Sequence, residues 1–462
     1  MKYVMTFGVV DAQSVSRAVE IATEYQLKGH KLVVVVSAFP NVTEELSVIS
    51  EKALDGNLEM MNEFVQRHLQ HHINTATECI RDQNILHKVV EELNENSLEM
   101  RGILRSIARL RELTARSKDF VLSFGERLSA PILCGATAES GLRSEWLTGG
   151  DAGITTDEKF GEANPLMDPT VRKVRAKLEG MLKDGKFPIV AGRGAASPHG
   201  VTTTLGRGGS DYTATLIGAS LDADEVLIWK DMGGFMTADP SIVPNARLIQ
   251  KISYAEAVEM AYFGAKGIHP RALQPVMEMQ IPVRIRSFLD RTNEGTLIAG
   301  NREVKTGVVV KSVTLVRSVA MISVTGAGMA GLPGVAAKVF KVLGDAGINI
   351  LMISQSSSEA GISFVVPREK LQQAKNALGL GLIGAEFQIA SEDDVCVVAA
   401  VGAGMKGTPG VAARVFRVVA ENGVNVRMIA QGSSELNISL IVAEIDGPKT
   451  IQAIHKEFKL GK

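Results

Sequence analysis

The sequence predicts an α/β domain with a mostly parallel central sheet, followed by two smaller α+β domains. Short apolar runs such as 32–36 are continuous rather than alternating, which is typical of strands buried on both faces of a parallel sheet. They alternate with stretches of helical spacing, so that strand, helix and strand follow one another in fewer than forty residues. After about Asn301 the pattern changes, and one segment recurs 76 residues later. Recurrence at a fixed period predicts two copies of one domain.

Composition limits the class of protein. The chain has 462 residues, of which 45% are hydrophobic, and a formal net charge of -1. That balance provides large cores and gives no electrostatic case for binding nucleic acid or an anionic membrane. Cys79, Cys134 and Cys396 are far apart, so they indicate a reducing compartment rather than disulfides or a zinc site. No apolar run reaches transmembrane length and no signal-peptide core is visible, so we expect a cytoplasmic protein.

The elements of the first domain follow the order that a parallel sheet requires. Strands are expected at 3–7, 31–37, 187–191 and 226–229, and helices at 14–25, across 44–119 and at 170–183. Several strands end in Gly, Asp or Ser, at the edge where open α/β sheets bind ligands. His68, His71 and His72 lack a recognised metal-ligand spacing, and we interpret them as part of a solvated polar face.

The C-terminal third contains the repeat. Residues 326–340 recur as 402–416, and the short run 347–350 recurs as 423–426. Each copy has the pattern strand, Pro-Gly turn, helix, glycine, strand and a further strand. This pattern predicts a βαββ unit of the ferredoxin-like type.

The stretch 202–214 is the strongest candidate for a binding site. Three threonines precede a Gly-Arg-Gly-Gly turn, and a helical run follows. Glycines leave backbone N–H groups uncovered for an anion, and Ser210 or Asp211 can cap the helix, whose first turn carries partial positive charge. Arg207 adds a guanidinium suited to phosphate or carboxylate. The alternative is an ordinary glycine-rich turn with an N-cap, but the threonines and the arginine favour an anion site.

This stretch resembles the signature of the aspartate kinases, a family within the amino-acid kinase superfamily. Three other regions agree with the resemblance, namely 123–128, 237–240 and 263–271. The repeat resembles the paired ACT domains of that family. The resemblance implies a three-layer αβα kinase domain with a mostly parallel sheet at 1–305, one ferredoxin-like ACT domain at 306–390 and a second at 391–462. In this family the strand that enters the first ACT domain often joins the sheet of the second.

The resemblance implies ATP-dependent phosphorylation of the aspartate side chain, with Mg²⁺ as cofactor, as the first step towards lysine, threonine and methionine. The attacking carboxylate titrates near ~4, so it is already ionised at neutral pH and needs no general base. Catalysis then depends on in-line positioning and on neutralising the phosphate charge. Such a site requires hydroxyls, glycine amides and cations, which these motifs contain.

Matching positions assign roles to individual residues. The resemblance implies that aspartate binds Ser37, Thr43, Glu126, Thr202 and Thr204, with its ammonium on Glu126. The nucleotide is expected at Gly8, Gly208, Gly209, Ser210, Asp231, Phe235, Asp239 and Lys266. The charged groups expected beside the phosphates are Arg193, Arg207, Asp211, Lys230 and Lys266. No residue is assigned to a protein-held metal, and His269 is expected to be structural. The alternatives are a capping or ion-pair role for Glu126 and a plain surface position for Lys266.

The first strand departs from the family pattern. Relatives end it with Lys-Phe-Gly-Gly-Thr-Ser, whereas this chain has Thr6 in place of the lysine and a loop shorter by about three residues. Loss of one preorganised electrostatic contact costs about 10²–10³ in rate. Arg193 and Lys230 are cations that relatives lack at those positions. Either one of them stands in for the lysine, or the site has drifted.

Two functions of different classes therefore remain open, with a kinase for another small carboxylate as a less favoured third. The motifs favour an active aspartate kinase with amino-acid feedback, and the altered first loop favours a weakened or inactive homologue that acts as an amino-acid-sensing regulatory subunit. In the family an effector of the lysine or threonine class binds paired ACT domains, and the matching positions are Asp345, Asn349, Gln355, Asn425 and Gln431. Turn chemistry is the alternative for the two asparagines. We expect a homodimer or larger assembly through the ACT domains.

Overall fold

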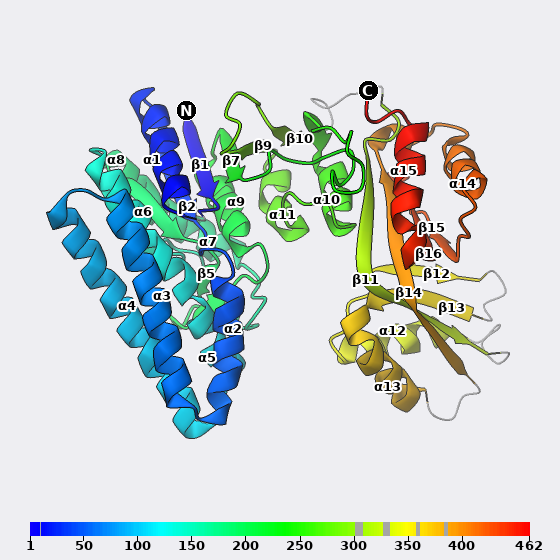
Figure 1. Cartoon of the computed structure of the whole chain (residues 1–462), viewed down its shortest axis with the longest axis horizontal. Coiled ribbons are helices and arrows are strands. Elements are labelled where there is room, and N and C mark those ends of the chain that lie inside the picture. Colours follow the sequence, from blue (N-terminus) through cyan, green and yellow to red (C-terminus); the bar gives the residue numbers. More distant parts are fainter. Residues whose placement is uncertain (10, 301–307, 327–332, 357–360, 383–386) are drawn as a thin grey trace. The chain divides into compact units, whose positions relative to one another are not determined.

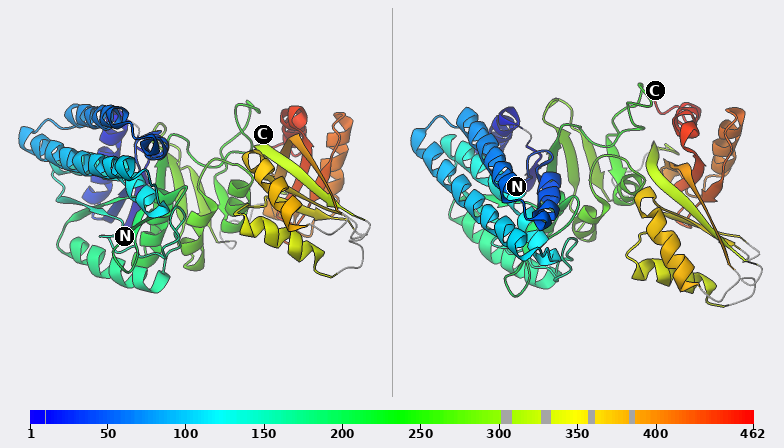
Figure 2. Two further views of the ribbon diagram at one scale, coloured as in Figure 1. Left: turned by 90° about the horizontal axis from the view of Figure 1, so that it is seen from below. Right: turned by 60° about the horizontal axis from the view of Figure 1, so that its bottom comes forward.

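The computed structural model describes residues 1–9, 11–300, 308–326, 333–356, 361–382 and 387–462. The chain divides into two compact units, which are described separately (Figures 1 and 2). The first unit contains Met1–Gly234, Gln250–Tyr254 and Gly267–Val304, and the second contains Phe235–Ile249, Ala255–Lys266 and Lys305–Lys462. Within the described ranges, no helix is both long enough and apolar enough to span a lipid bilayer.

The first unit is built on an eight-stranded sheet of order β3-β4-β2-β1-β7-β9-β10-β8. Its strands are β1 Lys2–Phe7, β2 Lys31–Val36, β3 Ser144–Thr148, β4 Phe187–Ala191, β7 Glu225–Lys230, β8 Lys251–Ser253, β9 Val283–Ser287 and β10 Thr296–Ala299. The six strands from β3 to β9 are parallel, and β10 runs antiparallel to β9. A separate hairpin pairs β5 Gly194–Ala196 with β6 Thr202–Thr204. The predicted mostly parallel sheet is confirmed.

Helices cover both faces of this sheet. They are α1 Ala12–Leu27, α2 Val42–Lys52, α3 Leu58–Cys79, α4 Gln83–Leu110, α5 Ala115–Leu122, α6 Phe124–Glu139, α7 Met167–Val174, α8 Gly180–Lys183, α9 Gly209–Leu221 and α11 Pro270–Glu278. Helix α10, Tyr254–Tyr262, belongs to the second unit except for its first residue. Short turns of helix occupy Ala53–Asp55 and Arg175–Glu179. On one face, Met5, Phe7 and Trp229 pack into a core with α1 and α6. On the other face lies α9, which is buried along its whole length and contacts β1, β2 and β7.

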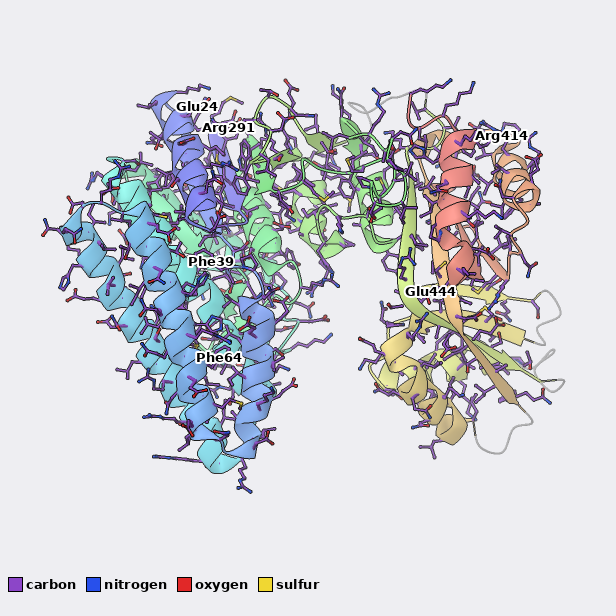
Figure 3. All side chains as sticks on the ribbon, in the orientation of Figure 1. Glu24, Phe39, Phe64, Arg291, Arg414 and Glu444 are labelled. Atoms are coloured by element: carbon purple, nitrogen blue, oxygen red, sulfur yellow. The ribbon has the colours of Figure 1, made fainter. Side chains whose placement is uncertain are left out.

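Two histidines of α3 correct the expectation of a solvated face. His68 and His72 are buried, because they continue the stripe of α3 that packs inward, whereas His71 is exposed. The His72 ring stacks on Phe39 at 4.9 Å, and His68 packs on Phe64; both phenylalanines are labelled in Figure 3. Burial lowers the pKa of His72 to about 4, so the ring is neutral. In the described ranges no three His, Cys, Asp or Glu side chains converge as metal ligands.

The second unit contains a six-stranded antiparallel sheet of order β12-β13-β11-β14-β16-β15. Its strands are β11 Ser312–Thr325, β12 Met352–Gln355, β13 Gly361–Pro367, β14 Gln388–Val401, β15 Met428–Ala430 and β16 Asn437–Ala443. Its helices are α12 Val335–Asp345, α13 Leu371–Gly381, α14 Val411–Glu421 and α15 Gly447–Glu457, with short turns at Arg368–Lys370, Ala403–Met405 and Glu444–Asp446. Strand β11 enters beside the end of β14 and continues beside β13 of the first repeat.

Candidate active site

The start of α9 is the centre of the candidate site. Gly206 and Gly208 adopt left-handed conformations with φ of 78° and 72°, which glycine adopts at little cost. Gly208 is the N-cap, and no side chain in the described ranges caps this helix. The expectation that Ser210 or Asp211 caps α9 is therefore wrong, because the turn itself delivers the chain into the helix. The first turn of α9 keeps its positive end uncapped, as an anion site requires.

Lys230 and Asp211 form the closest ion pair of the site. Lys230 ends β7, and its Nζ lies 2.7 Å from Asp211 Oδ2 in the first turn of α9. The same Nζ donates a hydrogen bond of 2.6 Å to the Gly267 carbonyl oxygen. About a third of the lysine side chain is still exposed to solvent. The pair therefore fixes a cation at the carboxyl edge of the sheet without burying it.

Glu126 and Arg193 form a second, looser pair. Glu126 lies in the first turn of α6 with 2% of its side chain exposed, and its Oε1 is 3.5 Å from Arg193 Nε. That distance is longer than a good hydrogen bond. Burial raises the pKa of Glu126 to about 7, and the nearby Arg193 charge opposes that rise. The ion pair that was the alternative prediction for Glu126 is thus present, and its role in substrate binding stays a prediction.

The loop that follows β2 approaches Glu126. The Ser37 amide donates to the Phe7 carbonyl, so the ends of β1 and β2 meet. A Cβ atom on Gly125 would lie 3.4 Å from Thr43 Oγ1, which shows how closely the first turn of α6 approaches α2. Ser37, Thr43 and Glu126 therefore share one region of the first unit.

Asp119 is a residue of the site that the sequence reasoning missed. This buried carboxylate accepts hydrogen bonds from Thr204 N, from Thr204 Oγ1 and from Gly161 N at 2.8 to 2.9 Å. Burial raises the pKa of Asp119, and those hydrogen bonds oppose the rise. The Thr204 hydroxyl is consequently held by the protein. The available signal was a single acid beside the apolar run 120–122.

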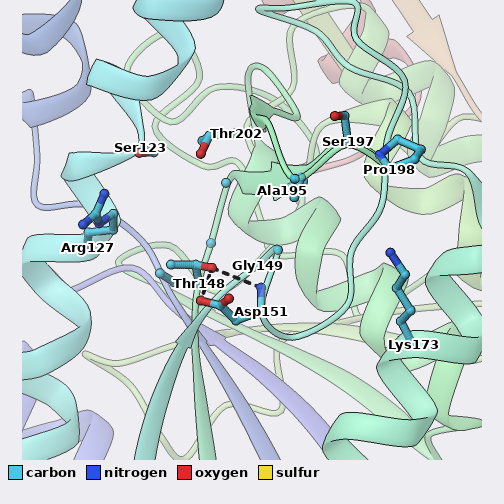
Figure 4. Close-up of a pocket in the computed structure, with 16 residues that line it drawn as sticks. Ser123, Arg127, Thr148, Gly149, Asp151, Lys173, Ala195, Ser197, Pro198 and Thr202 are labelled. Atoms are coloured by element: carbon cyan, nitrogen blue, oxygen red, sulfur yellow. Dashed lines mark hydrogen bonds between the residues drawn. The ribbon is translucent and has the colours of Figure 1, made fainter. Parts of the chain in front are cut away.

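A cavity of about 340 Å³ adjoins these residues (Figure 4). Its wall contains Thr202, Ser123 and the glycines on either side of Arg193. Figure 4 shows Arg127 and Lys173 on opposite sides of it, with Thr148 donating a hydrogen bond to Asp151 between them. Its volume is in the range of small-molecule sites. Thr202 is the predicted substrate residue that faces this space.

The remaining predicted site residues are distributed over both units. In the first unit, Gly8 N donates to Trp229 O, Asp231 is exposed after β7, and Arg207 is exposed near His269. His269 is the N-cap of α11, and a Cβ atom on Gly208 would lie 2.6 Å from it, so its predicted structural role is confirmed. Phe235, Asp239 and Lys266 belong to the second unit, where Phe235 is fully buried. Their nucleotide contacts stay predictions.

Comparison with known proteins agrees with this geometry. Residues 8–287 match the amino acid kinase family, and residues 322–379 and 398–458 match the ACT domain. Aspartokinase 1, chloroplastic, of Arabidopsis thaliana is 32% identical over 471 residues, covering 98% of this chain and 80% of that protein. The chain belongs to the aspartokinase family.

A solved structure and a second relative agree with this family assignment. The structure of E. coli aspartokinase III in complex with aspartate and ADP matches with a TM-score of 0.81 at 26% identity, covering 99% of both chains. The bifunctional aspartokinase/homoserine dehydrogenase 2, chloroplastic, of Arabidopsis thaliana is 33% identical over 446 residues. That match covers 94% of this chain, which spans about half (48%) of the bifunctional protein. The predicted family and its C-terminal ACT domains are confirmed.

The ACT region of this chain contains a groove of about 560 Å³ beside β12 and β15. Gln355 lines it, together with Arg427, which follows Asn425 by two residues. The other effector candidates lie on the surface: Asp345 is paired with Lys341, Asn349 is close to Tyr262, and Gln431 is exposed. Effector binding by these five residues stays a prediction.

Proposed function

We propose that this chain transfers the γ-phosphate of ATP to the side-chain carboxylate of aspartate, giving 4-phospho-aspartate for lysine, threonine and methionine biosynthesis. The observation that carries the proposal is Lys230 on Asp211 at the uncapped start of α9. Phosphoryl transfer to an ionised carboxylate needs a positive environment for the phosphates rather than a base. The helix start, Lys230 and the exposed Arg207 supply that environment.

The geometry of the sheet favours Lys230 as the replacement for the missing lysine. In the parallel register of β1 and β7, Thr6 is opposite Ile228. Alternate residues of a strand point to the same face, so Lys230 projects from the face shared by Thr6 and Ile228. That is the face covered by α9, and the pair with Asp211 agrees with it. Arg193 is instead engaged with Glu126. Strand β7 thus places a lysine on the same face of the sheet where relatives have the lysine of their first strand.

Mg²⁺ would act here by shielding phosphate oxygens. The ion usually keeps water and phosphate ligands, so it needs no cage of protein carboxylates. Asp211 is occupied by Lys230, and the exposed Asp231 carboxylate after β7 is the acidic group at this edge that fits such an ion.

A hydroxamate-trapped kinase assay with aspartate and Mg-ATP tests the proposal. We expect turnover by the unmodified chain and a fall in kcat of about 10²–10³ for Lys230→Met. Lys186→Met removes a lysine whose pair with Glu145 is exposed, and it should retain the original rate. An unchanged kcat in Lys230→Met would exclude Lys230 as the replacement cation.

The regulatory alternative is favoured by one observation. Thr6 Oγ1 is buried without a hydrogen-bond partner among the described residues, so the first strand presents no charge to the site. Calorimetry with ADP beside the kinase assay separates the two functions. Nucleotide binding without phosphoryl transfer would support an amino-acid-sensing regulatory subunit. In either function we propose that an amino acid of the lysine or threonine class binds the ACT domains and that these domains pair between copies of the chain.

A further inference from the structure

A second groove of the first unit lies between α3 and α4, which run side by side in Figures 1 and 2. Its volume is about 660 Å³, within the range of small-molecule sites. The described residues that line it include none of those assigned to the candidate active site, and all of them are polar or charged. A ligand that fills this groove must therefore be polar, and it would bind at a separate place.

Helical spacing turns two arginines of α4 towards the groove. Met100 and Leu104 of α4 are buried in the core. Each is followed by an arginine that lines the groove, Arg101 and Arg105. Residues four apart are neighbours on a helix face, so the two guanidiniums start one turn apart. Arg105 Nη2 donates a hydrogen bond of 3.2 Å to Asn62 Oδ1 of α3, which fixes the register of the two helices at this point.

The groove has an excess of positive charge. Among the described residues that line it, Arg67, Arg101 and Arg105 are accompanied by a single acid, Glu63. An arginine is always charged at neutral pH and has five N–H donors. Arg101 Nε is buried and lacks a hydrogen-bond partner among the described residues. Such a donor is exceptional in a native fold and is typically satisfied by an ordered water or an ion. The groove is therefore suited to an anion.

Arg67 connects the groove to α2. Its Nη2 lies 2.6 Å from Glu45 Oε2, and His68 Nε2 lies 3.0 Å from the same oxygen. Glu45 belongs to α2 and follows Thr43, a predicted substrate residue, by two positions. A ligand on Arg67 consequently competes with Glu45 for the guanidinium, and through Glu45 it acts on the helix that carries Thr43.

The three guanidiniums come from both walls of the groove, two from α4 and one from α3. A single phosphate or carboxylate cannot engage arginines on both walls at once, whereas a molecule with several anionic groups can. We propose that the groove binds a small polyanion, a molecule with two or more phosphate or carboxylate groups, at a site separate from the candidate active site. Guanidinium groups accept both kinds of anion through paired hydrogen bonds.

Calorimetry with the full chain measures the affinity for inorganic pyrophosphate, citrate and acetate. We expect pyrophosphate and citrate to bind at least about tenfold more tightly than acetate, because each can engage one more guanidinium. The double variant Arg101→Met/Arg105→Met keeps apolar stems in place of the arginines and should weaken both polyanions by about tenfold or more for each arginine removed. Glu63→Gln removes the acid of the groove and should tighten both, by roughly two- to fivefold.

Two features of the design isolate the groove. Arg109→Met changes an exposed arginine one turn further along α4 that does not line the groove, so this matched control should bind all three probes as the unmodified chain does. Arg67 is left unchanged because its replacement would also release Glu45. Equal affinities for acetate and citrate, or equal affinities of the double variant and the unmodified chain, would overturn the proposal.

Hydrogen exchange locates the bound probe, because pyrophosphate also suits the uncapped start of α9. We expect both polyanions to slow exchange in 62–70 and 101–105, and the double variant should lose this protection while any protection of 202–211 persists. Protection confined to 202–211 would overturn the groove site and leave the kinase proposal intact. Absence of phosphoryl transfer would overturn the kinase proposal alone, since binding in the groove is measured without it.

Discussion

The two ACT repeats share a fold but not a core. The described core of the first repeat consists of residues from that repeat alone, among them Val339 and Phe364. The core of the second repeat includes Ala238 and Val243, which precede the repeats by more than sixty residues. Within the second unit, the segment Phe235–Ile249 is therefore packed as part of the second repeat. The difference shows that duplication of a domain does not duplicate its connections.

Two side chains of α15 in the second repeat are within hydrogen-bonding distance of this segment. His455 Nε2 lies 3.0 Å from Thr237 Oγ1, and Gln452 Nε2 donates to the Ile242 carbonyl. Counting 76 residues back from these two positions leads to Gly379 and Asn376. Glycine has no side chain to make the corresponding contact. Because Phe235–Ile249 contains part of the proposed nucleotide site, the second repeat is the copy placed to influence it.

The largest effect is expected from the buried pair of Lys311 and Glu256. Their side chains approach to 2.8 Å and are 5% and 1% exposed, and Glu256 also accepts from Ala403 N in the second repeat. Lys311→Met leaves a buried carboxylate without its cation, which costs about 3–5 kcal/mol. Thermal unfolding should report a large loss of stability, and hydrogen exchange in 235–249 should accelerate.

Lys341→Met is the matched control for that variant. It removes an exposed pair with Asp345 in the first repeat, which is worth about 0.5 kcal/mol or less. Equal losses of stability in the two variants would contradict the expectation that the buried pair of Lys311 and Glu256 contributes far more than the exposed pair.

An intermediate effect is expected from two valine truncations. Val243→Ala and Val339→Ala each remove buried methyl groups, one from each repeat core, and each should cost about 2 kcal/mol. Only Val243→Ala should also raise the KM for ATP, by about tenfold if 1.4 kcal/mol of the loss falls on nucleotide binding. Unfolding curves and steady-state kinetics on the same preparations provide the measurement. A tenfold rise in Val339→Ala as well would remove the distinction between the repeats.

Local pattern predicted those parts of the molecule that depend on neighbours along the chain. The apolar runs of β1, β2, β4 and β7 lie in a parallel sheet because residues buried on both faces leave a continuous apolar signal. The turn before α9 could also be predicted, because its glycines are neighbours in the sequence. Within the site, the motif singled out Glu126, which the structure places in the first turn of α6.

Contacts between distant segments were not predictable in this way. Asp119 meets Gly161 and Thr204, which are 42 and 85 residues away, and His455 meets Thr237 across 218 residues. A single sequence has no periodic signal for such pairs. The prediction of a solvated face at His68 and His72 was wrong for another reason. A neutral histidine can be buried on the inward stripe of a helix, and classing the residue as polar does not reveal this.

The smallest effect is expected from the pH dependence of the contact at His455. Burial lowers the pKa of His455 below its ordinary value near ~6.5. As pH falls through about 6.5, the unfolded chain takes up a proton that the folded chain does not, so the second unit loses stability in acid and is insensitive to this group above that range. The hydrogen bond itself survives, because a protonated ring nitrogen still donates to Thr237, and only the cost of burying the charge remains. Hydrogen exchange in 235–249 should therefore rise gently below about pH 6.5, and His455→Gln should flatten that slope.

Following this segment alone separates His455 from His72 and Glu126, which titrate in the first unit. The first repeat has Gly379 at the corresponding position, so α13 should show no slope from this source; an equal slope there would mean that acid acts on both repeats through some other group.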